Sequence, residues 1–252
     1  MEYVRLGKSN LLISRVAFGS MRLTEQDSED AAILVRKAYE EGINFFDTSR
    51  KTPASEKLLG DALYDIRSNV VLSTTTSAKT VSDIKADLEE SLMTLHTDSI
   101  DLYQYETDKF VPMESCADKI YDTLLELKNQ GKIKHIGLVT TDFETAMKAV
   151  NSGLYETIQF PFNMIVPENT FLLVKLCEEK DVGFIAMQPL CGGVLQNIPL
   201  ALGFLHQFEN VIPLWGATTQ EEMDQILYFN SNPPVIDENF KADIEKARSF
   251  FN

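Results

Sequence analysis

Two acidic residues end short apolar segments of the chain, where a sheet edge would hold a carboxylate in place. Asp47 follows the segment INFF, and Glu106 ends the segment SIDLYQYE. Two carboxylates close together can serve as general acid and general base on one small molecule. A structural alternative exists for each residue. Asp47 would accept hydrogen bonds from N–H groups of the next loop, and Glu106 would be a solvated polar residue without a role in catalysis.

Other polar residues follow similar apolar segments, and each has both a functional and a structural interpretation. The threonines at 74–76 end the segment NVVLSTTT and could line a polar pocket. Because β-branched residues also suit strands for packing reasons alone, we expect only Thr75 of the three to line the site. Cys191 stands beside two glycines, where a nucleophilic thiolate is one interpretation. No base is evident near it, so we expect an ordinary loop residue there.

Side-chain alternation in the segment SIDLYQYE separates its aromatic residues from its polar ones. Tyr103 and Tyr105 alternate with Gln104 and Glu106. Successive side chains of a strand point to opposite faces, so the two tyrosines are expected to pack outward in the core while Glu106 faces the other side.

The histidines and cysteines do not indicate a metal site. His96 and His135 are expected before strands, away from the predicted site, and His206 in an amphipathic helix. The three cysteines have neither the spacing of metal ligands nor that of a disulfide framework, a pattern that fits a reducing cytoplasm.

Net charge limits the classes of partner. The chain carries a formal charge of -15, which leaves no basic excess for nucleic acid or for an anionic membrane surface. The first residues lack the apolar core of a signal peptide, and no apolar run approaches membrane-spanning length. We therefore expect a cytoplasmic protein with a small-molecule substrate and with neither a nucleic-acid nor a membrane partner; a protein partner stays open.

Short apolar segments alternate with amphipathic ones along the whole sequence. The segments with helical periodicity are 27–42, 55–66, 81–95, 117–131, 142–153, 168–181, 197–208, 219–229 and 237–251. The segments expected as strands are 11–20, 43–49, 69–76, 99–106, 133–140, 156–163, 182–190 and 210–216, after a hairpin within residues 2–10.

About eight strand–helix units predict an α/β fold, a (β/α)8 TIM barrel. The hairpin would plug one end of the barrel, and residues 237–251 would form an extra helix at the carboxyl end. An open doubly wound sheet is the rival, but no glycine-rich phosphate turn follows the first strand. No linker divides the chain, so a single domain over residues 1–252 is expected.

Several motifs, in this order, resemble the aldo/keto reductase family along nearly the whole chain. They are YVRLGKSNLLISRVAFGSM, GINFFDTSR with SEKLLGDAL, LEESLMTLHTDSIDLYQ, GKIKHIGL, GLYETIQFPFN, GFIAMQPLCGG and VIPLWGATTQEEMDQIL. The carboxy-terminal PLWG form looks like the short bacterial branch. The chain is also shorter than a typical member, so reduced loops over the barrel mouth are expected.

The resemblance implies NADPH-dependent reduction of a carbonyl group by a tetrad of aspartate, tyrosine, lysine and histidine. Asp47 matches the aspartate. The other three positions fall on Thr52, Thr75 and Glu106, so the tetrad looks mostly replaced. A threonine hydroxyl is a poor acid at neutral pH, and loss of a general acid typically costs about 10²–10⁴ in rate. Arg50, Lys51 and Lys79 are candidates to replace the lysine beside Asp47.

The resemblance also implies the positions that would hold the cofactor. They are Thr140, Gln159, Met187, Gln188, Thr218 and Thr219. At the last strand–helix junction the family usually has basic groups for the 2′-phosphate, whereas here Glu221 and Glu222 would repel it. A helix amino terminus there still offers N–H groups. NADP is therefore a doubtful cofactor, and no metal is expected.

Three functions remain open. The first is a divergent enzyme that acts on a small carbonyl or hydroxyl compound by Glu/Asp acid–base chemistry, such as dehydration or isomerisation, with weak or no use of NADPH. The second is an NAD(P)H-dependent oxidoreductase with Glu106 in place of the usual acid. The third is a non-catalytic barrel that binds a ligand or a partner.

Overall fold

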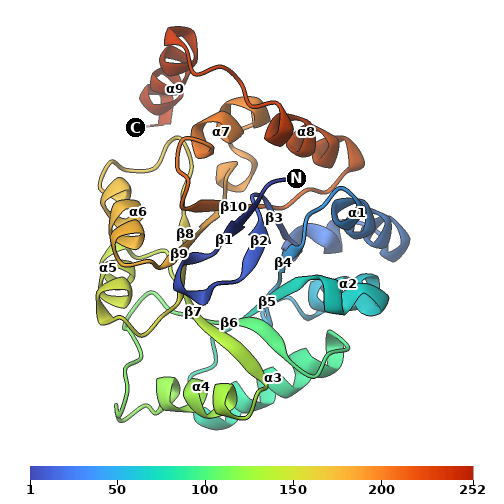
Figure 1. Ribbon diagram of the computed structural model, residues 1–252, viewed down its shortest axis with the longest axis vertical. Coiled ribbons are helices and arrows are strands. Elements are labelled where there is room, and N and C mark those ends of the chain that lie inside the picture. The colour runs from blue at the N-terminus through green and yellow to red at the C-terminus, as the bar shows by residue number, and fades with distance from the viewer. Residues whose placement is uncertain (252) are drawn as a thin grey trace.

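The centre of the molecule is a closed barrel of parallel strands surrounded by helices (Figure 1). The computed structural model describes residues 1–251. The barrel strands follow one another in chain order from β3 to β10, and β10 closes the ring by pairing with β3. The predicted (β/α)8 barrel is therefore confirmed.

The bounds of the elements agree closely with the sequence periodicity. The barrel strands are β3 (Ala17–Gly19), β4 (Phe45–Asp47), β5 (Val71–Thr76), β6 (Ile100–Glu106), β7 (Ile133–Val139), β8 (Thr157–Pro161), β9 (Gly183–Met187) and β10 (Val211–Trp215). The helices are α1 (Ser28–Glu40), α2 (Pro53–Leu63), α3 (Val81–Thr94), α4 (Ile120–Asn129), α5 (Phe143–Ser152), α6 (Thr170–Glu179), α7 (Ile198–Leu205), α8 (Gln220–Ser231) and α9 (Glu238–Phe251).

The barrel strands are apolar on both faces because both faces are covered. Side chains that point outward pack against the helices, as Tyr103 and Tyr105 do on β6, which confirms the expected alternation. Side chains that point inward fill the amino-terminal end of the barrel with a second, smaller cluster: Leu6, Ile13, Ala17, Phe45, Leu102, Ile185, Ile212 and Leu214. This apolar layer closes the barrel below the polar layer of the candidate site.

An amino-terminal hairpin closes the bottom of the barrel. Its strands β1 (Tyr3–Arg5) and β2 (Leu12–Ser14) pair antiparallel. The prediction that Leu12–Ser14 belong to the first barrel strand is wrong, because that strand begins only at Ala17. Gly7 has a φ of +49°, and a Cβ there would lie 2.2 Å from the backbone nitrogen of Gly183, so only glycine fits this contact.

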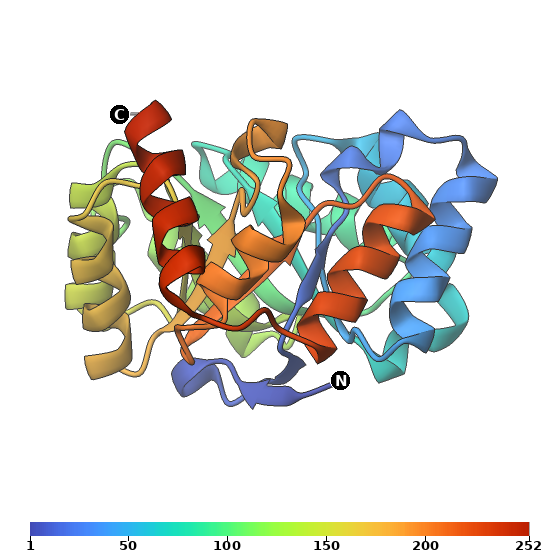
Figure 2. The same cartoon turned by 90° about the horizontal axis from the view of Figure 1, so that it is seen from above.

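The last helix lies along the side of the barrel with its carboxyl end at the opposite face from the hairpin (Figure 2). The Nε of Arg248 donates to the carbonyl oxygen of Met164 at 2.8 Å, and the guanidinium lies over the rings of Phe171 and Phe204. This contact joins α9 to the loop after β8. Within residues 1–251, no helix is long and apolar enough to cross a membrane.

Candidate functional site

Inward-pointing polar side chains form a layer above the apolar plug, at the carboxyl ends of the barrel strands. Asp47 ends β4, Gln104 and Glu106 lie on β6, and Gln159 lies on β8. Asp47 pairs in register with Ser73 of β5. In barrels of this type the carboxyl ends of the strands carry the active site, so the fold brings the two predicted carboxylates, Asp47 and Glu106, to the same end.

The Asp47 carboxyl is enclosed by uncharged groups. Its side chain is 4% exposed. Gln104 Nε2 donates to Oδ1 at 3.3 Å, and Gln159 Nε2 donates to Oδ2 at 3.4 Å. Burial raises the pKa of Asp47 to about 7, against the lowering effect of hydrogen bonds from Ser73, Gln159 and Gln104. Asp47 is therefore a carboxyl group that exchanges its proton close to neutral pH.

The Lys51 side chain reaches the mouth of the barrel but does not contact Asp47. Its Nζ lies 2.7 Å from Oε1 of Glu106, and 29% of the Glu106 side chain is exposed. No ion pair of Asp47 with Arg50, Lys51 or Lys79 occurs in the described part of the chain. The hypothesis that one of these cations takes the role of the lysine expected beside Asp47 is therefore not supported, and the mouth instead holds a Lys51–Glu106 ion pair.

Arg50 turns away from the mouth and into a buried polar cluster. Its guanidinium binds the fully buried carboxylate of Glu56, which also accepts hydrogen bonds of 2.8 Å from Thr74 and Ser91. A second ion pair joins Arg50 to the exposed Glu90 at 3.3 Å. This cluster fixes the loop between β4 and α2, which carries Lys51.

The two threonines predicted to match tetrad positions occupy different environments. Thr52 is half-buried at the start of α2, and its hydroxyl donates to the carbonyl oxygen of Ser49 at 3.3 Å. Thr75 is 4% exposed and pairs in register with Gln104, so it belongs to the same inward-facing layer. Thr74 points outward to Glu56, which fits the expectation that Thr75 alone of the three threonines lines the site.

The positions predicted for the nicotinamide end of a cofactor lie around the same mouth, with several polar groups already engaged. The Thr140 hydroxyl donates to Asp108 at 2.9 Å, and the N–H of Thr141 donates to the same carboxylate oxygen at 2.6 Å. Met187 ends β9 and is half-buried. Gln188 follows it with a φ of +58°.

At the junction between β10 and α8, the carboxylate of Glu222 accepts hydrogen bonds from nearby donors of the same junction. Thr219 is the N-cap of α8 and accepts the N–H of Glu222 at 3.1 Å. The Glu222 carboxylate in turn accepts the N–H of Thr218 at 2.8 Å and its hydroxyl at 3.1 Å. This is a capping-box type of arrangement. A side-chain carboxylate therefore takes N–H and hydroxyl donors that a phosphate would need.

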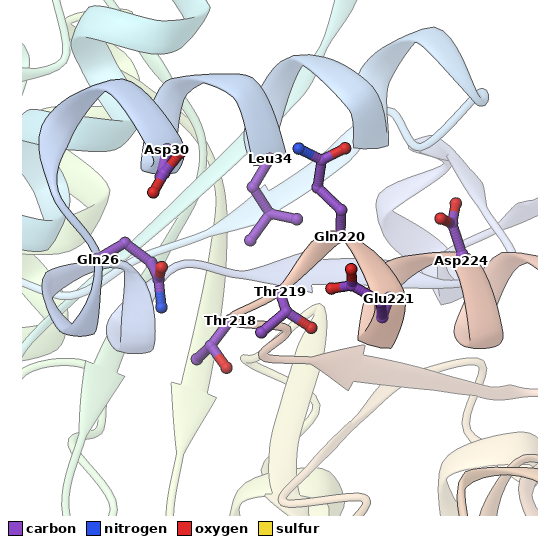
Figure 3. A pocket seen from close by; sticks show the side chains of 8 residues that line it. All are labelled: Gln26, Asp30, Leu34, Thr218, Thr219, Gln220, Glu221 and Asp224. Carbon is purple, nitrogen blue, oxygen red and sulfur yellow. The ribbon is translucent and has the colours of Figure 1, made fainter.

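A surface cavity of about 400 Å³ lies beside this junction, between α1 and α8 (Figure 3). Its lining consists of Gln26, Asp30, Leu34, Thr218, Thr219, Gln220, Glu221 and Asp224. Three of these side chains are acidic and none is basic, although Lys37 pairs with Asp224 at 2.7 Å. The cavity therefore favours a hydroxyl-rich group over an anion.

The remaining candidates from the sequence lie outside the polar layer. His135 lies within β7, not before it, and contacts Glu156 at 2.6 Å, while His206 follows the last residue of α7. Cys191 is half-buried in the loop after β9. Among residues 1–251, no group of three His, Cys, Asp or Glu side chains is placed to hold a metal ion.

Comparison with known proteins places the chain in a family. A family model described as the aldo/keto reductase family matches residues 15–200. The chain is 28% identical to the oxidoreductase YqkF of Bacillus subtilis over 216 residues, covering 79% of this chain and 68% of that protein. It is also 28% identical to an L-galactose dehydrogenase of Arabidopsis thaliana over 214 residues, 77% of this chain and 67% of the other.

The solved structures agree on the fold. The holo form of aldo-keto reductase AKR11C1 from Bacillus halodurans superposes with a TM-score of 0.84 at 21% identity, over 98% of this chain and 96% of that one. The chain is also 28% identical to the protein named Probable aldo-keto reductase 1 of Glycine max over 225 residues, covering 79% of this chain and 64% of that protein. It thus spans about two thirds of the length of these three relatives. Given the matched family model and the barrel with its ordered motifs, the chain belongs to the aldo/keto reductase family.

Proposed function

We propose that this protein catalyses proton transfer on a small carbonyl or hydroxyl compound at the barrel mouth, as in isomerisation or dehydration, instead of standard NADPH-dependent ketone reduction. The observation that supports this most is the Asp47 carboxyl, buried among uncharged groups with a pKa raised to about 7. A general acid or base works best when its pKa lies near the working pH.

Lys51 at the mouth supplies the second group that such a reaction needs. Asp47, once ionised, takes a proton from the carbon next to a carbonyl group, and the electron pair moves to the carbonyl oxygen. The Lys51 ammonium, which lies at the mouth with Glu106, donates a hydrogen bond to that developing oxyanion. The hydroxyl proton on the deprotonated carbon then passes to the oxyanion, and Asp47 returns its proton to the former carbonyl carbon, which completes an isomerisation.

The residues present do not fit the 2′-phosphate of NADPH. The Thr218 N–H and hydroxyl are bound by Glu222, and the adjacent cavity adds Asp30 and Glu221 without a lining cation. A phosphate there would meet like charge at short range. For this reason no step of the proposed reaction uses NADPH.

Deuterium exchange tests the proposed proton transfer. In D2O without any nicotinamide, the purified protein should introduce deuterium next to the carbonyl group of dihydroxyacetone or hydroxyacetone, as followed by proton NMR. The Lys51→Met variant should lose about 10–100-fold in exchange rate, because one hydrogen bond to an oxyanion contributes roughly that much or more. The matched control is Lys57→Met, whose lysine pairs with Asp61 on the outside of α2. Equal rates with and without protein would refute proton transfer on these compounds.

A second candidate function is an NADH-dependent oxidoreductase, favoured by family membership and by the acidic cavity. YqkF and the L-galactose dehydrogenase are named for redox activities. Carboxylates such as Asp30 and Glu221 accept hydrogen bonds from ribose hydroxyls and disfavour a 2′-phosphate. In this case Asp47 and Lys51 are the groups placed to protonate the substrate oxygen, while the nicotinamide would supply hydride.

Fluorescence titration with both dinucleotides separates the two candidates. NADPH should bind at least about tenfold more weakly than NADH, since one like-charge contact costs roughly 1.4 kcal/mol or more. Glu221→Arg should reduce the ratio of the NADPH dissociation constant to that of NADH. Glu238→Arg on α9 serves as a control for added positive charge. Micromolar binding of NADH favours the oxidoreductase; binding of neither dinucleotide leaves proton transfer as the better function. Tighter binding of NADPH would contradict the assignment of the acidic cavity.

A further inference from the structure

Two buried polar atoms inside the barrel lack a partner among the described residues. They are Oε1 of Gln104 and Oγ1 of Thr157, both fully shielded from solvent. An unpaired buried polar atom typically costs about 1–3 kcal/mol. Gln104 contacts Asp47 directly, and Thr157 begins β8 two residues before Gln159, so the hydrogen bonding of these two atoms bears on the chemistry of Asp47.

The sheet register places these two atoms on either side of one glycine. Gln104 of β6 pairs with Gly137 of β7, and Gly137 pairs with Thr157 of β8. A Cβ on Gly137 would lie 2.3 Å from Thr157 Oγ1 and 3.0 Å from Gln104 Oε1. Because glycine has no side chain, the Gln104 carboxamide and the Thr157 hydroxyl face each other across this gap.

The carboxamide hydrogen bonds on the other side of Gln104 suit an ionised Asp47, whereas a protonated Asp47 has only the Ser73 hydroxyl as an acceptor among its hydrogen-bond partners. Gln104 Nε2 lies within reach of three acceptors, at 3.3 Å from Asp47, 3.1 Å from Ser73 and 2.7 Å from Gln159. Gln159 Nε2 also points its N–H at Asp47. Both carboxamides thus present donors to the carboxylate, and a protonated Asp47 would find no acceptor in them.

Rotation of both carboxamides by half a turn produces a complementary network. Gln159 then presents its oxygen to the Asp47 O–H, and its nitrogen donates to the Gln104 oxygen. Gln104 directs its nitrogen across the gap above Gly137 toward the Thr157 hydroxyl, and a side-chain shift must close this gap before the hydroxyl accepts. The Gln104 oxygen gains a donor in this arrangement, and the Thr157 hydroxyl is paired once the gap closes.

We propose that Gln104 is a positioning residue for Asp47, whose carboxamide rotates together with that of Gln159 when Asp47 gains or loses a proton and passes a hydrogen bond to Thr157. No bond is made or broken apart from the proton on Asp47. The groups that face Asp47 from the neighbouring strands are Ser73, Gln104 and Gln159, and Gly19 pairs with it from β3. None of these is charged; the charged groups at this end are Lys51 and Glu106 at the mouth. This inference deepens the proposed function, since it concerns how Asp47 changes protonation state.

Thr157→Val tests the proposal without touching Asp47. Valine keeps the shape of threonine but removes the acceptor that only the protonated state uses, and it relieves the unpaired hydroxyl of the ionised state. The Asp47 pKa, followed by carbon-13 NMR of its carboxyl group, should fall by about one unit, because a hydrogen bond typically contributes about 1 kcal/mol. Thr157→Ser should restore the original pKa. Thr123→Val, at a buried hydroxyl on α4, should leave it unchanged.

A second measurement needs no substitution. In the unmodified protein, nuclear Overhauser contacts between the Gln104 amide protons and the Thr157 methyl group should be strong below the Asp47 midpoint and weaken above it. An unchanged Asp47 titration in Thr157→Val overturns the proposal, as does a pH-independent contact. A water molecule bound between Gln104 and Thr157 in high-resolution structures at both low and high pH would overturn it too. None of these measurements needs a substrate, so their outcome is independent of the outcome of the deuterium-exchange test.

Discussion

Asp47→Asn should lower the rate of deuterium exchange by about 10²–10⁴-fold while leaving the fold intact, which is the usual loss for removal of a general acid or base. Asparagine has nearly the shape of aspartate but cannot take up or release a proton. The loss should appear in kcat more than in KM, since the group acts on the proton and not on binding. The measurement is the initial rate of deuterium incorporation at saturating substrate.

The same variant should be more stable than the parent protein at high pH, which distinguishes lost chemistry from lost structure. The pKa of Asp47 is raised from 3.8 to about 7 in the folded protein, so ionisation opposes folding. The contribution of protonated Asp47 to the free energy of unfolding is complete below pH 4 and is lost as the pH rises to about 7. At pH 8 Asp47→Asn should therefore gain up to about 3–4 kcal/mol in free energy of unfolding. At pH 4 the two proteins should unfold at similar denaturant concentrations.

An activity loss accompanied by lower stability at pH 8 would contradict this account of Asp47. So would a full exchange rate in Asp47→Asn, which would assign the proton transfer to another group. The control is Asp65→Asn, whose side chain is mostly exposed and pairs with Arg36 on the outside of the barrel.

Glu56→Ala should destabilise the protein by about 3–5 kcal/mol, the usual range when one partner of a buried ion pair is removed. Glu56 is fully buried, and its loss leaves the mostly buried Arg50 guanidinium without its interior partner. The hydroxyls of Thr74 and Ser91 lose their acceptor as well. Urea unfolding followed by circular dichroism measures this difference.

Glu90→Ala is the matched control because Glu90 binds the same arginine from the surface. Its side chain is 59% exposed, and exposed ion pairs usually contribute 0–1 kcal/mol. If both substitutions change the unfolding midpoint equally, the buried cluster does not hold the loop between β4 and α2.

Glu56→Ala should also affect Lys51, which lies in this loop. The rate of deuterium exchange should fall even under conditions where Glu56→Ala remains folded.

The sequence predicted the barrel well because its signals are local. Apolar segments separated by amphipathic helices identify the strand–helix units, and capping residues such as Asp142 mark where helices begin. The boundary between the hairpin and the first barrel strand was assigned wrongly, since Leu12–Ser14 and Ala17–Gly19 are both short strands that bury two of their three residues. Only their pairing partners distinguish them, and pairing is not a local property.

Parts of the candidate site were less accessible to sequence reasoning. Alternation along β6 already placed Gln104 on the same face as Glu106, which was a usable signal for its inward direction. Its contacts with Asp47 and Gln159 depend on the stagger of non-adjacent strands, which the sequence does not reveal. Arg50 and Lys51 are neighbours in one loop yet bind carboxylates on different sides of it, Glu56 and Glu106. Such a choice is made by packing, so a long flexible side chain in a loop cannot be assigned a partner in advance.

The hairpin that closes the barrel has a consequence for synthesis on the ribosome. Arg5 forms an ion pair with Asp181, Lys8 donates its N–H to the carbonyl oxygen of Asp181, and Gly7 packs against Gly183. Leu6 and Ile13 therefore obtain much of their shelter from segments that are translated far later. Until then the nascent chain carries exposed apolar side chains, a condition that invites aggregation or chaperone binding.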